Sequence, residues 1–145
     1  MGEARNTIER MTLLFDSGDV EASLDCFADD ATFTNPLGTN RGRDEIAVMF
    51  RMFDAAFSGL SHGISRAVTA GESEATEGVV TCTHTGTLPS PAGDVPATGR
   101  SIELPQALWA TVRDGKIVEF HGYWDLASFM GQLGLAPEPA AAATA

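Results

Sequence analysis

The chain has 145 residues and a formal net charge of −11, and 43% of its residues are hydrophobic. This length fits one domain with a real core. The negative charge repels phosphate backbones and the sequence has no basic cluster, which argues against a nucleic-acid partner. No apolar run is long enough to span a bilayer, so a membrane protein is not expected either.

The N-terminal residues and the two cysteines indicate an intracellular protein. Residues 1–6 lead directly into an amphipathic pattern and lack the apolar core of a signal peptide, so we expect a cytoplasmic location. Cys26 and Cys82 form no C-x-x-C motif. In that compartment two reduced, buried thiols are favoured over a disulfide.

The first half of the chain has helical periodicity. Residues 4–17 predict an amphipathic helix, and a short second helix is expected over 20–27. A β-prone stretch over 31–34 then ends in the turn "NPLG". A third helix is predicted over 43–57, and Gly59 ends it.

From Leu60 onward the hydrophobic period changes to two, which predicts strands. We expect four of them, at about 61–70, 74–87, 99–112 and 116–125. A short helical segment follows over 125–134, and the low-complexity tail 135–145 is expected to be disordered. Residues 1–134 therefore predict a single α+β domain, in which a curved antiparallel sheet folds around helices and leaves a conical cavity.

Two stretches of the sequence carry a family resemblance. "DSGDVEASLDCFADDATFTNPLG" resembles the N-terminal third of bacterial ketosteroid isomerases, and "RDGKIVEFHGYWDLASFMGQLG" resembles the C-terminal part of SnoaL-like polyketide cyclases and limonene-type epoxide hydrolases. The chain is thus similar to the NTF2-like superfamily from about residue 5 to 134. The resemblance implies an NTF2-like cone of three N-terminal helices packed on a curved sheet, a fold that hosts unrelated chemistries.

The resemblance also implies which catalytic groups are missing. Ketosteroid isomerases use a Tyr and two Asp residues, and the matching positions here hold Met11, Asn35 and Leu108. SnoaL-type cyclases use an Asp and a His where this chain has Gly122 and Leu108, together with an Asn that survives as Asn35. Epoxide hydrolases place their Asp at the position of Gly122. The acid–base groups of all three relatives are therefore replaced by side chains that cannot ionise.

Strand alternation extends this comparison to a cavity lining. If Gly122 faces inward, its neighbours two residues away do so as well, although a bulge at Pro105 could shift the register of the preceding strand. The same aromatic set would also serve as plain core. The expected substrate-binding residues are Met11, Phe15, Phe50, Phe53, Phe57, His84, Gln106, Leu108, Phe120, Gly122 and Trp124, with Asn35 as the catalytic candidate.

The three histidines do not predict a metal centre. His62, His84 and His121 lie on different predicted strands with no carboxylate or Cys at metal spacing, so neither a metal nor another cofactor is expected. The string "CTHTG" resembles a strand end of SnoaL-like proteins, which favours a structural His84 and leaves a catalytic one as the alternative. Asp125 is expected to cap the last helix.

An apolar cup without a general-base carboxylate suits a reaction that needs no proton removal. The first hypothesis is a tailoring cyclase of polyketide (antibiotic) biosynthesis that closes a ring in an apolar polyene by shape, for example by pericyclic cycloaddition. Asn35 would donate a hydrogen bond to a substrate carbonyl, or it merely ties the turn before Pro36. The alternatives are a non-catalytic carrier of an apolar metabolite and a His84-dependent isomerase.

The outer face of the sheet is expected to form a homodimer. Trp109 and Tyr123 are typical interface anchors when they point outward. By alternation the outward set is Glu103, Ala107, Trp109, Thr111, His121 and Tyr123. The expected partners are therefore an apolar small molecule and a second copy of the chain.

Overall fold

Helix α1 (Glu3–Asp16) forms because its buried side chains recur at helical spacing. The buried set is Ala4, Thr7, Ile8, Met11 and Thr12. The helix ends where the Ser17 hydroxyl donates to the Leu14 carbonyl at 2.8 Å, and Gly18 then turns the chain with a φ of +85°. The computed structural model describes residues 2–135, and the predicted first helix is confirmed to within one residue.

The second helix is shorter than expected. Helix α2 (Val20–Leu24) begins at Asp19, whose carboxylate accepts a hydrogen bond from the Ala22 N–H, and it ends before Phe27. Residues 25 and 26 form a turn, and strand β1 (Phe27–Asn35) takes the last residue of the predicted helix because Phe27 pairs with Ile117 in the sheet. Tertiary pairing therefore overrides the local helical pattern here.

A short strand stands where only a turn was expected. Strand β2 (Gly38–Arg41) pairs antiparallel with β1, and Asn35 faces Gly38 across a two-residue loop. Helix α3 (Arg43–Ala56) follows and buries Ile46 and Phe50 among others. It ends one residue before the prediction, because Phe57 already has an extended backbone and opens the next strand.

The four predicted strands are present. They are β3 (Phe57–Ala70), β4 (Ser73–His84), β5 (Ser101–Arg113) and β6 (Lys116–Trp124), followed by helix α4 (Leu126–Gln132). With β1 and β2 they form one sheet of order β2-β1-β6-β5-β4-β3, in which β1 runs parallel to β6 and every other neighbouring pair is antiparallel. The α+β fold class is confirmed, with this one parallel pair as an addition.

Pro105 does not shift the register of β5. The pairing of β4 with β5 runs unbroken from Ser73↔Thr111 to Thr83↔Ser101. Both the N–H and the carbonyl of Glu103 bond to the Gln132 side chain of α4, so this edge of β5 faces away from β4. Pro105 lies two residues along the same edge, beyond the last partner of β6, where its missing N–H breaks no ladder bond.

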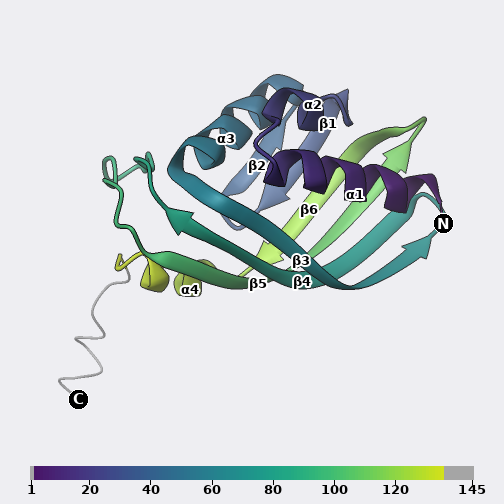
Figure 1. Ribbon diagram of the computed structural model, residues 1–145. Coiled ribbons are helices and arrows are strands. Elements are labelled where there is room, and N and C mark those ends of the chain that lie inside the picture. Colours follow the sequence, from purple (N-terminus) through teal and green to yellow (C-terminus); the bar gives the residue numbers. More distant parts are fainter. Residues whose placement is uncertain (1, 136–145) are drawn as a thin grey trace, which may run out of the picture.

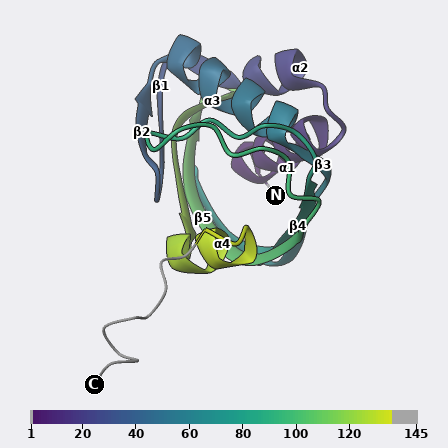
Figure 2. The same cartoon turned by 90° about the vertical axis from the view of Figure 1, so that its left-hand side faces the viewer.

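The sheet curves strongly, and α1 and α3 lie across its concave side while α4 closes one end (Figures 1 and 2). Arg5 ties α1 to β4 through an ion pair with the buried Glu74, with 2.9 Å between Nε and Oε2. Two buried apolar clusters result, one under α1 and α3 and one around α4.

The structure also bears on the predictions for the C-terminal tail, for membrane spans and for the two cysteines. Of the expected tail, 136–145 lie outside the described residues, and Leu135 donates its N–H to the Met130 carbonyl. No helix within residues 2–135 is long and apolar enough to cross a membrane. Both cysteines are free thiols as predicted, but only Cys26 is buried as expected, and Cys82 is partly exposed.

Candidate functional site

The register of the sheet builds one wall of a cavity. Cross-strand neighbours on the concave face form successive rows, of which Val80↔Leu104, Gln106↔Trp124 and Leu108↔Gly122 are three. Side chains in these rows point to the same side because the strand period is two. The complete lining is Met11, Thr12, Phe15, Phe33, Asn35, Met49, Phe50, Phe53, Phe57, Leu60, His62, Val80, Cys82, Ile102, Leu104, Gln106, Leu108, Phe120, Gly122, Trp124 and Phe129.

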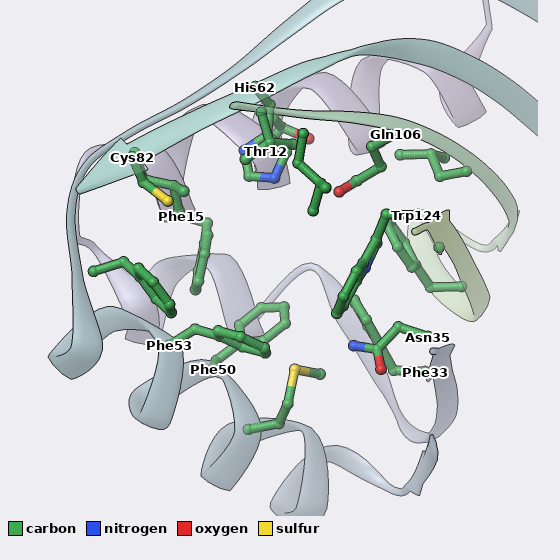
Figure 3. Close-up of a pocket in the computed structure, with 18 of the residues that line it drawn as sticks. Thr12, Phe15, Phe33, Asn35, Phe50, Phe53, His62, Cys82, Gln106 and Trp124 are labelled. Carbon is green, nitrogen blue, oxygen red and sulfur yellow. The ribbon is translucent and has the colours of Figure 1, made fainter. Parts of the chain in front are cut away.

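The cavity is apolar and partly open to solvent. Its volume is about 140 Å³, close to that of an apolar cavity of ~150 Å³ that takes up benzene. Polar lining groups are few, and Figure 3 shows them in two places: Asn35 beside Phe33 on one side, and Thr12, His62 and Gln106 across the cavity. A ligand would therefore be held mainly by apolar contact and oriented at two ends.

Aromatic rings brace the wall around Asn35. Phe33 stacks on Phe120 with 4.3 Å between ring centroids and an interplanar angle of 9°. Phe50 meets Phe33 edge-on at 5.6 Å, and Phe15 packs on Phe50 at 4.7 Å. Such interlocked rings hold each other in fixed rotamers, so the shape of this wall is built in before a ligand arrives.

Asn35 combines the two roles that its position suggested. Its Oδ1 accepts a hydrogen bond from the Leu37 N–H at 2.8 Å, which ties the β1–β2 turn. Because a backbone N–H needs an oxygen as its partner, this contact fixes the amide orientation and leaves the Nδ2 group as the free donor. Asn35 is only 8% exposed, and Figure 3 shows its amide nitrogen directed toward the cavity.

Gly122 leaves space beside Asn35. Its backbone is not in the left-handed region, so this strand position would accept other residues. A Cβ placed there would lie 3.6 Å from the Phe120 ring and 4.0 Å from the Asn35 Cβ. By contrast, a Cβ on Gly78 would meet the Gly63 carbonyl oxygen at 1.9 Å, so the backbone itself requires that glycine. Gly122 is therefore a gap in the wall and not a backbone requirement.

The structure gathers the predicted residues with one exception. Met11, Asn35 and Gly122 line the cavity, as do the other predicted members Phe15, Phe50, Phe53, Phe57, Gln106, Leu108, Phe120 and Trp124. Phe57 does so from the start of β3 and not from the third helix. The roles of these residues toward a ligand stay proposals.

His84 lies outside the cavity lining. It is fully buried, and its Nδ1 accepts a hydrogen bond from the Thr98 N–H at 3.2 Å. Its ring packs against Phe57 with 5.3 Å between centroids. The side chain therefore anchors the connection between β4 and β5. Since Nδ1 accepts this hydrogen bond, Nε2 carries the proton of the neutral ring, and it is buried without a hydrogen-bond partner among residues 2–135, so neither nitrogen is placed to act as a base. The structural interpretation of "CTHTG" fits this geometry, and the placement of His84 among the substrate-binding residues does not.

A polar pair at the other end of the cavity was not predicted from the sequence. His62 lines the cavity, and its Nδ1 lies 2.6 Å from Oδ1 of Asp16. Strand alternation alone could have turned His62 inward beside Leu60. The partner could not have been found in this way, because Asp16 precedes His62 by 46 residues and no local motif joins them.

Cys82 also lines the cavity, and its thiol is unreactive at neutral pH. Burial raises the pKa of its thiol to about 11. A neutral thiol is a poor nucleophile, so Cys82 contributes apolar surface at neutral pH. Within residues 2–135 no three His, Cys, Asp or Glu side chains are placed to hold a metal ion.

The chain matches known proteins over most of its length. A family model described as a SnoaL-like domain matches residues 8–120. IdmH from Streptomyces antibioticus, a proposed polyketide cyclase, is 29% identical with a TM-score of 0.74, and the match covers 92% of this chain and 99% of IdmH. None of the curated proteins searched matches the sequence.

Two further solved structures support the fold alone. A proposed polyketide cyclase from Xanthomonas campestris is 24% identical with a TM-score of 0.75, over 90% of this chain and 96% of that one. A hypothetical protein from Catenulispora acidiphila with a ketosteroid isomerase-like fold, solved with trimethylamine, is 22% identical with a TM-score of 0.73, over 90% and 93%. The resemblance stated from the sequence is confirmed at the level of family and fold.

Proposed function

Since the chain belongs to the SnoaL-like domain family, and since its cavity holds one oriented amide donor among apolar walls, we propose that it is a polyketide cyclase. In this proposal it closes a ring in an apolar, polyene-type substrate, for example by pericyclic cycloaddition, as a tailoring step of antibiotic biosynthesis. The similarity to the proposed cyclase IdmH supports the general class. The finer statement rests on the geometry around Asn35.

The observation that carries the proposal is the orientation of the Asn35 amide. Leu37 occupies Oδ1, so Nδ2 is free to donate into the cavity. A substrate carbonyl bound there would be polarised, which is worth roughly 1–3 kcal/mol for one well-placed hydrogen bond. In a cycloaddition this withdraws electrons from the alkene conjugated with the carbonyl and lowers the barrier.

The remaining acceleration would come from shape. A flexible polyene loses most of its conformational freedom on reaching the reactive fold, and a rigid cavity can supply several kcal/mol by holding it there. The stacked Phe33 and Phe120 rings and the gap at Gly122 form such a fixed surface beside the donor. No proton has to move in this reaction, which suits cavity walls formed by residues such as Met11, Leu108 and Gly122 that cannot ionise.

The test separates the donor role of Asn35 from its role in the turn. Asn35→Asp keeps an oxygen for the Leu37 N–H but replaces the Nδ2 donor by a second acceptor. Turnover of a linear trienone, in which a diene and an enone are joined by a short chain, should fall by roughly ten- to a hundred-fold in Asn35→Asp and in Asn35→Leu. The exposed Asn6→Leu serves as the matched control and should leave the rate unchanged.

The outcomes distinguish three explanations. Normal turnover in Asn35→Asp would remove the donor from the mechanism and leave shape as the only catalyst. A wild-type protein that binds the trienone without closing it would instead favour the carrier hypothesis. Mass spectrometry of the purified protein under native conditions would then search for the metabolite that it retains.

The assembly and location stay proposals as well. Trp109 and Tyr123 are 44% and 53% exposed on the convex face, and His121 stacks on Tyr123 with 4.2 Å between ring centroids. Exposed aromatic side chains of this kind favour a homodimer through that face. The proposed location is the cytoplasm.

A further inference from the structure

The pair formed by His62 and Asp16 joins β3 to the last turn of α1. Oδ2 of Asp16 accepts the His62 backbone N–H at 2.9 Å, and Oδ1 lies 2.6 Å from His62 Nδ1. Both side chains are largely covered, with 22% and 16% of their surfaces exposed. The Asp16 carboxylate therefore contacts both the backbone and the side chain of His62. These two contacts fix the position of the imidazole between β3 and α1.

This contact decides which ring nitrogen carries the proton. An ionised carboxylate only accepts hydrogen bonds, so the imidazole Nδ1 must be the donor. In the neutral ring Nε2 then bears the free lone pair, and the carboxylate stabilises the imidazolium that forms when Nε2 takes a proton. No hydrogen bond within residues 2–135 occupies His62 Nε2.

The contact between β3 and α1 does not require the imidazole ring of His62. The backbone bond from His62 to Asp16 already holds β3 against α1, and any residue except proline could donate it at position 62. The ring is added on the cavity side, where His62 shares a row with Val80 and Leu104. Shifts in the pairing of β3 with β4 on either side of His62, between Ser58 and Ser61 and between Ile64 and Arg66, are of the kind often found beside functional sites.

Two polar side chains without a side-chain hydrogen bond in the described part of the chain lie on the same side of the cavity as His62. Figure 3 shows Thr12 and Gln106 there, and both also line the small adjoining pocket with His62. Within residues 2–135 neither the Thr12 hydroxyl nor the Gln106 amide enters a side-chain hydrogen bond. This end of the cavity thus offers a base and two groups that can donate to an oxygen.

We propose that His62, held by Asp16, is a general base of this cavity and that its substrate is a carbonyl compound with an acidic C–H beside the carbonyl or one double bond away. His62 Nε2 takes the proton as the C–H bond breaks. The electron pair moves into the carbonyl, and Thr12 or Gln106 donates to the resulting enolate oxygen. The imidazolium then returns the proton to another carbon of the conjugated system, so a double bond shifts and no other reagent is consumed.

This inference rests on the proposed function in one respect, namely that the cavity binds a substrate. It adds a second reaction, a shift of a double bond. A double-bond shift would convert an unreactive polyene carbonyl into the conjugated diene that ring closure needs. Asn35 would hold one end of the chain while His62 acts at the other. The two ends can therefore be tested independently.

The probe is β,γ-cyclohexenone, whose conversion into its conjugated isomer is followed by absorbance. We expect the wild-type protein to accelerate this isomerisation and His62→Gln to lose at least about 100-fold of the acceleration, the lower range for a general base. His121→Gln is the matched control, because His121 lies on the outer face and lines neither pocket. Thermal melting verifies that each variant is folded.

A second variant excludes a merely structural role. His62→Ala opens room for free imidazole, which should restore part of the lost rate if the missing group is a base. A rate retained in His62→Gln, or no rescue of a folded His62→Ala, would overturn the assignment. A wild-type protein that fails to accelerate the isomerisation would overturn it too, and the ring-closing proposal would still stand because it needs no proton transfer.

Discussion

The two polar ends of the cavity are built in different ways. At one end Asn35 stands in a short local motif, and its orientation is set by Leu37, two residues away. At the other end His62 depends on Asp16, 46 residues earlier in the chain. The first end has an amide that cannot ionise, and the second has an imidazole backed by a carboxylate. Neither Asn35 on β1 nor Gly122 on β6 can ionise, whereas β3 and α1 carry a pair that can take part in proton transfer.

This difference shows how one fold can change its chemistry without changing its cavity. The concave rows and the helix faces keep the same apolar shape whichever wall carries the reactive side chain. Met11, Leu108 and Gly122 line this cavity, and none of them can ionise. A reaction that depends on shape and a reaction that depends on a proton would therefore share one pocket and use opposite ends of it.

The largest effect is expected from filling the gap at the Asn35 end. Gly122→Leu should weaken the binding of acetylnaphthalene, an apolar ketone, by more than about 100-fold, because the new side chain would occupy the space beside Phe120 and Asn35. Isothermal titration measures the affinity. Ala107→Leu, on the outward face of β5, is the control and should bind normally. Unchanged affinity in Gly122→Leu would place the ligand elsewhere.

A second prediction concerns the exclusion of water from the cavity wall at Cys82. With its pKa raised to about 11, the Cys82 thiol should react with iodoacetamide roughly 100-fold more slowly at neutral pH than the same thiol in the unfolded chain. Mass spectrometry of the labelled protein at increasing pH measures this. Fast labelling near pH 8 would mean that water reaches this wall freely.

The same thiol makes a small contribution to the pH dependence of stability. Below about pH 9 the thiol is protonated in both the folded and the unfolded state. Between about pH 9 and about pH 11 only the folded protein keeps the proton, so the free energy of unfolding should fall as the pH rises. Cys82→Ser should remove that part of the slope in denaturant titrations.

Asp16→Asn should have a moderate effect, confined to the His62 end. An amide can hold the imidazole in either tautomer and cannot stabilise the imidazolium, so isomerisation of β,γ-cyclohexenone should slow by about ten-fold. Ring closure of the trienone, which depends on Asn35, should be unaffected. A parallel loss of both activities would show that Asp16 acts through the fold, and thermal melting would reveal that loss of stability.

The smallest effect on turnover is expected from the convex face. Replacing Trp109 and Tyr123 together by Ala should convert the proposed homodimer into a monomer, as measured by sedimentation at micromolar concentration. Both side chains point away from the cavity, so either activity should stay within about two-fold of the wild-type rate. A wild-type monomer would contradict the dimer proposal without touching the site.

The sequence by itself determined the order of elements, the concave face of the sheet and most of the cavity lining. Local periodicity gave the helical spacing of Ile8 and Met11 and the strand residues that share one face, and the family resemblance identified the face of Leu108, Phe120 and Trp124 as the inward one. The resemblance also placed Asn35 in the cavity lining, and the local turn motif identified the Pro36 that follows it. Tertiary structure decided the extra strand β2, the parallel pairing of β1 with β6, the removal of His84 from the site and the meeting of His62 with Asp16. Each of these depends on which distant segment packs against which, and hydrophobic periodicity carries no information about the partner of a polar side chain.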